Sequence, residues 1–212
     1  MRRLVSVWET VRFLSAKWKA YTRAYTGQLG WPLILYLRRP LFKSTAMLAC
    51  QHLARGRLLD IGTGPGRLPL VLANVARDVT CVGIDIEPIL LHDAQKNAIR
   101  NDVGDRVSFL LADVHGLPFI DKSFDMVISM MSLHLWRDPK QGVAEVFRVL
   151  KDGGTATVLV GRRFAYPGKM WLLDFFTRNS AKHIADVFRT SGFHVVQTSY
   201  PEVSLLSVTG WK

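Results

Sequence analysis

Leu58-Leu59-Asp60-Ile61-Gly62-Thr63-Gly64-Pro65-Gly66 is the stretch that decides the fold. Leu58–Ile61 predicts a short buried strand, and the glycines that follow allow a tight turn whose backbone can approach a ligand closely. Arg67–Leu72 predicts the start of a helix, and Pro69 is tolerated in its first turn because the N–H groups there have no intrahelical acceptor. A strand, a glycine turn and a helix start together place free N–H groups beside a ligand, as nucleotide sites do.

The glycine spacing and the acid before it separate two classes of cofactor. A dinucleotide-binding turn has the pattern G-x-G-x-x-G, but here the third glycine comes one residue early and Arg67 occupies its place. Asp60 stands two residues before the first glycine, where a carboxylate repels a pyrophosphate and attracts the ammonium group of a cofactor that carries an amino acid. This D-x-G-x-G-x-G pattern resembles motif I of the class I S-adenosylmethionine (SAM) methyltransferases. The alternative is a glycine-rich turn that binds no ligand.

Two further acids follow predicted strands in the order that a nucleoside site requires. Val79–Ile84 predicts the second strand and leads to Asp85, 25 residues after Asp60, close to the distance at which such folds place an acid on ribose hydroxyls. Val107–Ala112 predicts the third strand, with Asp113 directly after it. Asp113 has an alternative role as the cap of the following turn.

The rest of the chain predicts an open α/β sheet. A fourth strand, Phe124–Ser129, leads into a loop up to Trp136, and ligands of such sheets bind at the carboxyl ends of the strands. Asp138 is expected to cap the next helix. The remaining predicted elements are helices at 44–53, 67–77, 89–100, 139–150 and 180–191 and strands at 155–160, 194–200 and 203–211. The last two strands predict an antiparallel hairpin at the edge of a seven-stranded sheet.

The order of these features resembles one family. The segment from about Leu58 to Val160 is similar to the class I SAM-dependent methyltransferases, and more narrowly to the group of the ubiquinone/menaquinone C-methyltransferases, in which Ser-Leu-His-His-Trp is common. Leu135 replaces the second histidine of that motif. The resemblance implies a Rossmann-like α/β fold and SAM as the cofactor. The cofactor-binding residues that it implies are Asp60, Gly62, Thr63 and Gly64 around the methionine portion, Asp85 and Ile86 at the ribose and the adenine face, Asp113 and Val114 at the adenine, and Ser129 and Met130 beside the sulfur.

The acceptor side of the site has weaker signals. His134 is the one titratable group in the loop after the fourth strand, so it is the candidate catalytic base, and a histidine that packs or caps locally is the alternative. Further candidates are Tyr25 and, in an aromatic and basic insert after the fifth strand, Arg162, Arg163 and Tyr166. Transfer from a sulfonium mainly requires alignment and a dry pocket, so the sequence specifies these residues less strongly than the cofactor residues.

The positive charge is concentrated in residues 1–43. The chain has 28 Lys/Arg and 17 Asp/Glu, and this arm holds nine of the bases and one of the acids, so it carries +8 of the net +11. Apolar and aromatic side chains recur at steps of three and four along residues 2–26, which predicts an amphipathic helix. We expect the arm to cover the cofactor pocket as a lid or to contact an anionic membrane surface, and the two roles are compatible.

Length and composition limit the remaining possibilities. The 212 residues are enough for a SAM-binding domain at 44–212 and the arm at 1–43. Cys50 and Cys81 give neither a disulfide framework nor a metal-ligand spacing, so we expect no metal and a cytoplasmic protein, with peripheral membrane contact through the arm. The apolar run of the arm is shorter than the about 20 residues that span a bilayer.

Three functions fit these features. The first is a SAM-dependent methyltransferase that acts on a small, apolar acceptor such as a quinone, phenol, lipid or thiol. The basic arm suggests a second, an RNA or protein methyltransferase, but the fourth strand ends in Ser129-Met130-Met131-Ser132 and not in an Asn/Asp-Pro-Pro-aromatic motif, so nucleic acid is the less favoured partner. The third is a non-catalytic SAM-binding scaffold, which the intact acids after three strands disfavour.

Overall fold

A computed structural model describes residues 39–161, 181–202 and 205–212 of the chain. Its contacts divide the chain into a unit Met1–Leu41 and a unit Phe42–Lys212. The expected amphipathic helix at 2–26 and the insert after the fifth strand lie outside the described residues. The roles of the arm and the boundary at 43/44 therefore stay predictions.

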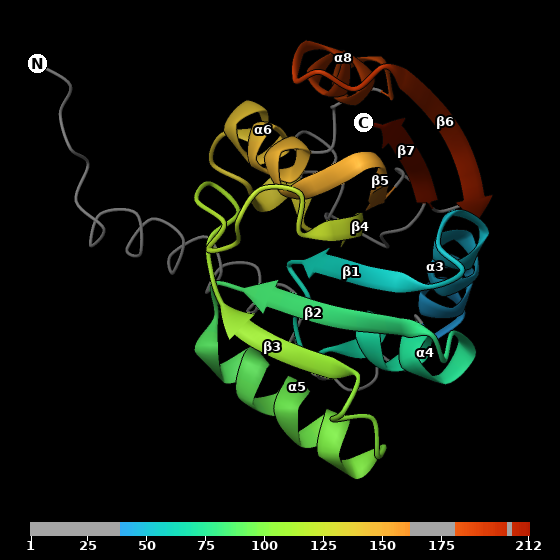
Figure 1. Ribbon diagram of the computed structural model, residues 1–212, viewed down its shortest axis with the longest axis vertical. Helices are drawn as coiled ribbons and strands as arrows, with labels where there is room; N and C mark the ends of the chain where they lie inside the picture. Colours follow the sequence, from blue (N-terminus) through green and yellow to red (C-terminus); the bar gives the residue numbers. More distant parts are fainter. Residues whose placement is uncertain (1–38, 162–180, 203–204) are drawn as a thin grey trace, which may run out of the picture. The chain divides into compact units, whose positions relative to one another are not determined.

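A seven-stranded sheet in the order β3-β2-β1-β4-β5-β7-β6 forms the centre of the second unit (Figure 1). Its strands are β1 (Gly56–Ile61), β2 (Val79–Asp85), β3 (Val107–Leu111), β4 (Phe124–Met130), β5 (Leu150–Gly161), β6 (Val195–Glu202) and β7 (Leu205–Trp211). The first five strands pair in parallel, while β7 runs antiparallel to both β5 and β6. This confirms the predicted Rossmann-like α/β sheet with an antiparallel hairpin at its edge.

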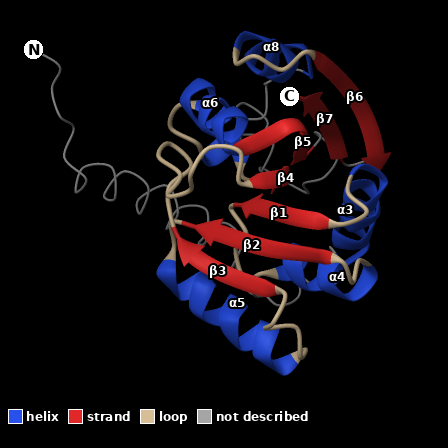
Figure 2. Ribbon diagram, in the orientation of Figure 1, coloured by secondary structure: helices blue, strands red, loops and turns tan. Residues whose placement is uncertain are grey.

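Helices flank this sheet (Figure 2). They are α3 (Arg39–His52), α4 (Arg67–Val75), α5 (Pro88–Arg100), α6 (Pro139–Val149) and α8 (Ala181–Thr190), with a short 3-10 helix η1 (Leu133–Leu135) after β4. The Asp138 side chain caps α6 as expected, because its carboxylate accepts from the N–H groups of Lys140 and Gln141 at 3.0 and 3.2 Å. Within the described residues, no helix is long and apolar enough to cross a bilayer.

Two elements begin earlier than the sequence predicts. The helix α3 begins at Arg39 and not at Ser44, because Pro40 stands in its first turn, where a missing N–H costs no hydrogen bond. The strand β5 begins at Leu150 and not at Thr155, since Leu150 already pairs with β4 before an irregularity in the register. Both differences extend the predicted elements without changing their order.

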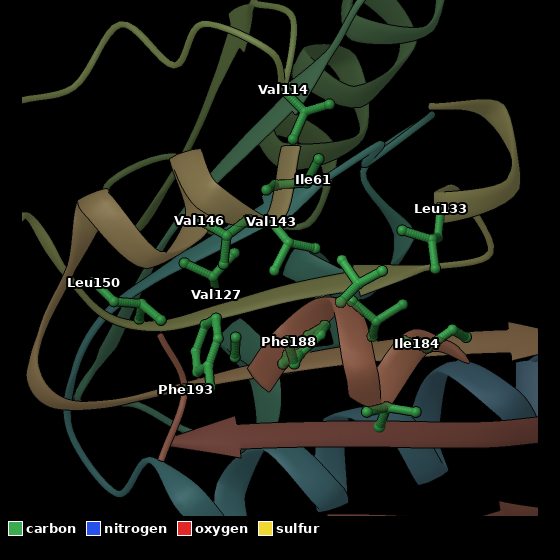
Figure 3. Close-up of a cluster of buried hydrophobic side chains, with 14 of the residues drawn as sticks. Ile61, Val114, Val127, Leu133, Val143, Val146, Leu150, Ile184, Phe188 and Phe193 are labelled. Carbon is green, nitrogen blue, oxygen red and sulfur yellow. The ribbon is translucent and has the colours of Figure 1, made fainter. Parts of the chain in front are cut away.

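The main hydrophobic cluster lies between one face of the sheet and the helices α6 and α8. Leu59 and Ile61 of β1 belong to it, whereas Leu58 and Asp60 alternate to the opposite face of the strand. Figure 3 shows Val143 and Val146 of α6 and Ile184 and Phe188 of α8 gathered with Val127 of β4 in this cluster. The helices α4 and α5 bury Leu68, Leu72, Leu91 and Ala94 outside it. The sheet is therefore covered on both faces, which leaves the strand ends to carry function.

The amino ends of β4 and β5 are held by ion pairs. Lys151 Nζ lies 2.8 Å from Asp125 Oδ1, and Lys122 Nζ lies 2.6 Å from Asp152 Oδ2. Near the carboxyl end of α6, Arg148 donates to Glu145 and Asp121, with 2.8 Å to each. Lys212 Nζ donates to the carbonyls of Phe147 and Leu150, both at 2.7 Å, and so satisfies acceptors that the end of α6 leaves open.

Candidate functional site

Three aspartates gather at the carboxyl ends of neighbouring strands. In the parallel register Asp60 of β1 pairs with Gly83 of β2, and Asp85 of β2 pairs with Leu111 of β3. Asp113 follows β3 by two residues. The order β3-β2-β1 therefore brings the three predicted acids to the same edge of the sheet, which is where open α/β sheets bind ligands.

The turn between β1 and α4 depends on two glycines for different reasons. Gly62 has φ +73°, and a Cβ built on it would lie 2.3 Å from Ser132 Cβ, so no other residue fits without a shift of the neighbouring loop. Gly64 has φ +54°, but a Cβ there would meet no atom within 4 Å. Gly62 thus allows close packing against the loop after β4, whereas Gly64 faces open space in which a ligand can approach the backbone.

Asp60 is buried at the base of this turn. It is 2% exposed, and Thr63 Oγ1 donates to its Oδ2 at 2.7 Å. Burial raises the pKa of Asp60 to about 7; the bond from Thr63 partly opposes this rise, and the charge of Asp85 adds to it. None of the ion pairs of Lys and Arg in the described part of the chain includes Asp60. A buried carboxylate without a basic partner favours a ligand that carries positive charge.

Asp85 closes the turn from the next strand. Gly64 N donates to Asp85 Oδ2 at 2.8 Å, and Glu87 N donates to Asp85 Oδ1 at 3.0 Å. Burial raises the pKa of Asp85, and the bonds from these backbone N–H groups oppose the rise. Ile86, the next residue, is 46% exposed, which leaves an apolar side chain at the edge of the site. The acid predicted for ribose therefore also orders the glycine turn.

Asp113 lies in a more open position and is bonded by a residue that the sequence did not single out. Its side chain is 41% exposed, and its Oδ1 accepts from the backbone N–H of His115 at 2.9 Å. The imidazole Nδ1 of His115 lies 2.5 Å from the same oxygen, and this bond lowers the pKa of Asp113. Val114 is buried in the hydrophobic cluster, so its side chain belongs to the core.

The end of β4 is tied to the end of β1 through Ser132. Its hydroxyl donates to Ile61 O at 3.0 Å and accepts from Trp136 Nε1 at 3.2 Å. Ser129 Oγ lies 2.6 Å from Ser132 Oγ, and since the proton of Ser132 is used on Ile61, Ser129 is the donor of this pair. The side chain of Ser129 is thus committed to the protein, and only its backbone is left for the predicted place beside the sulfur. Sequence reasoning missed Ser132 because its acceptor is a backbone carbonyl 71 residues earlier.

The backbone changes direction directly after β4. Met130 is half-buried, and its sulfur accepts from Thr45 Oγ1 of α3 at 3.5 Å. Met131 has φ +59°, a backbone conformation that residues other than glycine adopt at a cost in free energy. The half-buried His134 lies on η1, three residues further on. This positive φ places local backbone strain between β4 and the loop that carries the candidate base.

The structure thus brings the predicted cofactor residues to adjoining strand ends and joins the loop of His134 to them through Ser132. Tyr25, Arg162, Arg163 and Tyr166, which the sequence offered for the acceptor, lie outside the described residues. The set of groups fits a ligand with a positive charge, hydroxyls and an amine, because it combines the buried Asp60 and two more accessible acids with backbone donors.

Comparison with known proteins agrees with this geometry. Residues 59–158 match the family described as "Methyltransferase domain". The chain is 42% identical over 101 residues to the 27-O-demethylrifamycin SV methyltransferase of Amycolatopsis mediterranei, covering 48% of this chain and 37% of that protein. It is 38% identical over 103 residues to the demethylmenaquinone methyltransferase of Thermus thermophilus, covering 49% of this chain and 46% of that protein.

Solved structures share the fold over a greater length. A SAM-dependent methyltransferase from Aquifex aeolicus superposes with a TM-score of 0.71 at 18% identity, covering 85% of this chain and 97% of that chain. At this identity the likeness shows the fold alone. The curated relatives named above match this chain over less than half of their own length, so what they act on does not transfer directly.

Proposed function

We propose that this chain, whose residues 59–158 match a methyltransferase domain, binds SAM and transfers the methyl group to a small, apolar acceptor. The resemblance to methyltransferases expected from the sequence is confirmed, together with the enzyme class. The reaction of the whole protein, its acceptor and its binding residues are our proposal.

One observation carries the proposal: the site holds the buried Asp60 and the half-buried Asp85, and no Lys or Arg of the described residues pairs with either acid. A carboxylate that is buried without a cation destabilises the empty site, and a cationic ligand removes that penalty. SAM carries an ammonium and a sulfonium, whereas NAD would bring a pyrophosphate toward the same acids. The charge of the site therefore supports SAM over a dinucleotide.

Each part of SAM has residues that suit it. Asp60, Thr63 and the backbone of Gly62 and Gly64 would hold the methionine portion, since they combine a buried carboxylate with an open glycine face. The Asp85 carboxylate would accept from the ribose hydroxyls. The remaining proposed contacts are Ile86 and the backbone of Val114 on the adenine, Asp113 on its exocyclic amine, and the backbone of Ser129 and Met130 beside the sulfur.

Bound SAM supplies a methyl group on a positively charged sulfur, which is already a good leaving group. The chain then has to orient the acceptor and keep water out, because alignment accounts for most of the acceleration in such a displacement. His134, on the loop that Ser132 ties to β1, is proposed to accept a proton from acceptors that lose one. Acceptors that lose no proton need only the alignment.

The acceptor class is proposed from the chain and from its relatives. The relatives are named for 27-O-demethylrifamycin SV and for demethylmenaquinone. The charge of +8 in residues 1–43 suits an anionic membrane surface on which apolar acceptors dissolve. We therefore propose a cytoplasmic enzyme that contacts the membrane peripherally through this arm.

The same charge keeps a second candidate, an RNA methyltransferase, open to test. The experiment combines three measurements on the full chain: release of S-adenosylhomocysteine with a panel of quinones, phenols, thiols and RNA, flotation with anionic vesicles, and a gel shift with RNA at several salt concentrations. The proposal expects turnover with a ring acceptor and flotation at low salt. Turnover with RNA alone would replace it, and SAM binding without turnover on any acceptor would favour a scaffold.

A further inference from the structure

His115 joins the acid proposed for adenine to the start of α6. Its imidazole lies between Asp113 Oδ1, 2.5 Å from Nδ1, and the backbone N–H of Asp138, which donates to Nε2 at 3.0 Å. Its carbonyl accepts from Gln141 Nε2 at 2.7 Å. The side chain is 9% exposed, so these contacts replace water around the ring. His115 therefore links the β3–β4 connection to the start of α6, the helix that follows the loop with His134.

The contacts of the ring determine its tautomer. A backbone N–H can only donate, so Nε2 of His115 must present a lone pair to Asp138. The proton of the neutral ring is then on Nδ1, where it faces the carboxylate of Asp113. In a doubly protonated ring, the Nε2–H of His115 and the backbone N–H of Asp138 would be two donors facing each other. The structure thus holds His115 as a neutral donor to Asp113.

This donor leaves Asp113 with two unequal oxygens. Oδ1 accepts from both the backbone N–H and the ring Nδ1 of His115, so the orientation of the carboxylate is fixed. Among the described residues, no hydrogen bond to Asp113 Oδ2 occurs. That oxygen, on a side chain that is 41% exposed, is available to a donor on a ligand.

We propose that His115 is a positioning residue that orients Asp113 to accept from the exocyclic amine of a 6-aminopurine, and so sets the preference of the site for adenine. The inference rests on the proposed function, since it takes the ligand to be SAM. It assigns His115 no contact with the ligand. The effect of substituting His115 on ligand affinity should therefore depend on that amine, whereas a purely structural effect would not.

The test compares two nucleoside ligands. Affinities of S-adenosylhomocysteine and of its inosine analogue, in which a carbonyl replaces the 6-amino group, are measured for the wild type, His115→Phe and His115→Asn. We expect His115→Phe to weaken the adenosine ligand about tenfold and the inosine analogue less than about twofold, since one hydrogen bond to a charged group is lost. His115→Asn keeps an N–H near the position of Nδ1 and should restore most of the preference. His92→Phe, an exposed histidine on α5, is the matched control and should change neither affinity.

Two results would overturn the inference. Equal weakening of both ligands by His115→Phe would show a structural role only, and so would an unchanged preference. A double-mutant cycle with Asp113→Asn adds a check, because His115→Phe should have no further effect in that background. If His115→Phe does not fold, ¹⁵N NMR of the wild-type ring decides: the neutral Nδ1–H tautomer is expected, and an Nε2–H tautomer would refute the proposal. Absence of any binding by the wild type would instead refute the proposed function.

Discussion

Asp60 and Asp85, at the carboxyl ends of β1 and β2, have surroundings opposite to those of the acids near the amino ends of the strands. At the carboxyl ends, Asp60 and Asp85 are bonded by a hydroxyl and by backbone N–H groups, and burial raises the pKa of both. Near the amino ends and along α6 the acids are paired with bases and have lowered pKa values; the pairs are Asp125 with Lys151, Asp152 with Lys122, and Glu145 with Arg148. The paired acids serve stability, whereas Asp60 and Asp85, which pair with no base in the part of the chain that the structure describes, are costly to the fold unless a cation binds.

The largest expected effect comes from the joint between the cofactor turn and the loop after β4. Gly62→Ala should lower the free energy of unfolding by about 3 kcal/mol or more, because its Cβ would overlap Ser132 and its φ is positive. Gly64→Ala is the matched control, since it has a positive φ but open space, and should cost only about 1 kcal/mol. Urea unfolding measures both. Equal losses at the two glycines would contradict the close packing of Gly62.

The next prediction compares the substitution of one acid at the carboxyl end of a strand with the substitution of one acid at the amino end. Asp85→Ala should weaken SAM binding about 100-fold, because two charged hydrogen bonds to hydroxyls are lost, while the fold is retained. Asp125→Ala should lower the free energy of unfolding by about 1 kcal/mol, since its pair with Lys151 is partly exposed, and leave SAM affinity unchanged. Calorimetric titration and urea unfolding of both variants give the comparison. A variant of Asp85 that binds SAM normally would remove the distinction between the two ends.

The contributions of Asp60 and Asp125 to the free energy of unfolding change with pH in opposite directions. Asp60 has a folded pKa of about 7, above its ordinary 3.8, so between these values the folded state holds a proton that the unfolded state has lost. Its contribution to the free energy of unfolding therefore falls as the pH rises from about 4 to about 7. Asp125 has a lowered pKa, and its contribution is present above 3.8 and lost only in more acidic solution.

Urea unfolding at pH 5 and pH 8 tests this sign. Asp60→Asn should reduce the loss of stability between the two pH values, with a residual slope from Asp85, whose pKa is also raised. Asp125→Asn should leave the slope unchanged. An identical slope in the wild type and in Asp60→Asn would show that Asp60 is ionised in the folded protein throughout this range.

The smallest effect on cofactor binding is expected at the acceptor side. His134→Gln should change SAM affinity less than about twofold, because it lies on the loop beyond β4, and should lower kcat about 100-fold with an acceptor that loses a proton. His92→Gln is the control for removal of a histidine. Steady-state kinetics as a function of pH measures the effect. An unchanged kcat would reassign His134 to local packing, the alternative that the sequence left open.

The sequence predicts the cofactor half of the site better than the acceptor half, for physical reasons. Asp60, Gly62 and Asp85 follow from strand ends and turn chemistry, which are local in sequence. Ser132 bonds a backbone carbonyl that is distant in sequence, and His115 bonds the side chain of Asp113 and the backbone of Asp138. No rule of sequence spacing predicts these bonds. The early starts of α3 and β5 likewise depend on a tolerated first-turn proline and on tertiary pairing. The arm and the insert, which supplied the other acceptor candidates, lie outside the described residues.

The charge of the site is tested by a titration with SAM near pH 6 in two buffers of different ionisation enthalpy. We expect saturable binding with release of about one proton, because a cation that binds beside Asp60 lowers its pKa from about 7 and favours the carboxylate. The release should disappear in Asp60→Asn, and NAD should not bind. No binding of SAM, or tighter binding of NAD, would contradict the account.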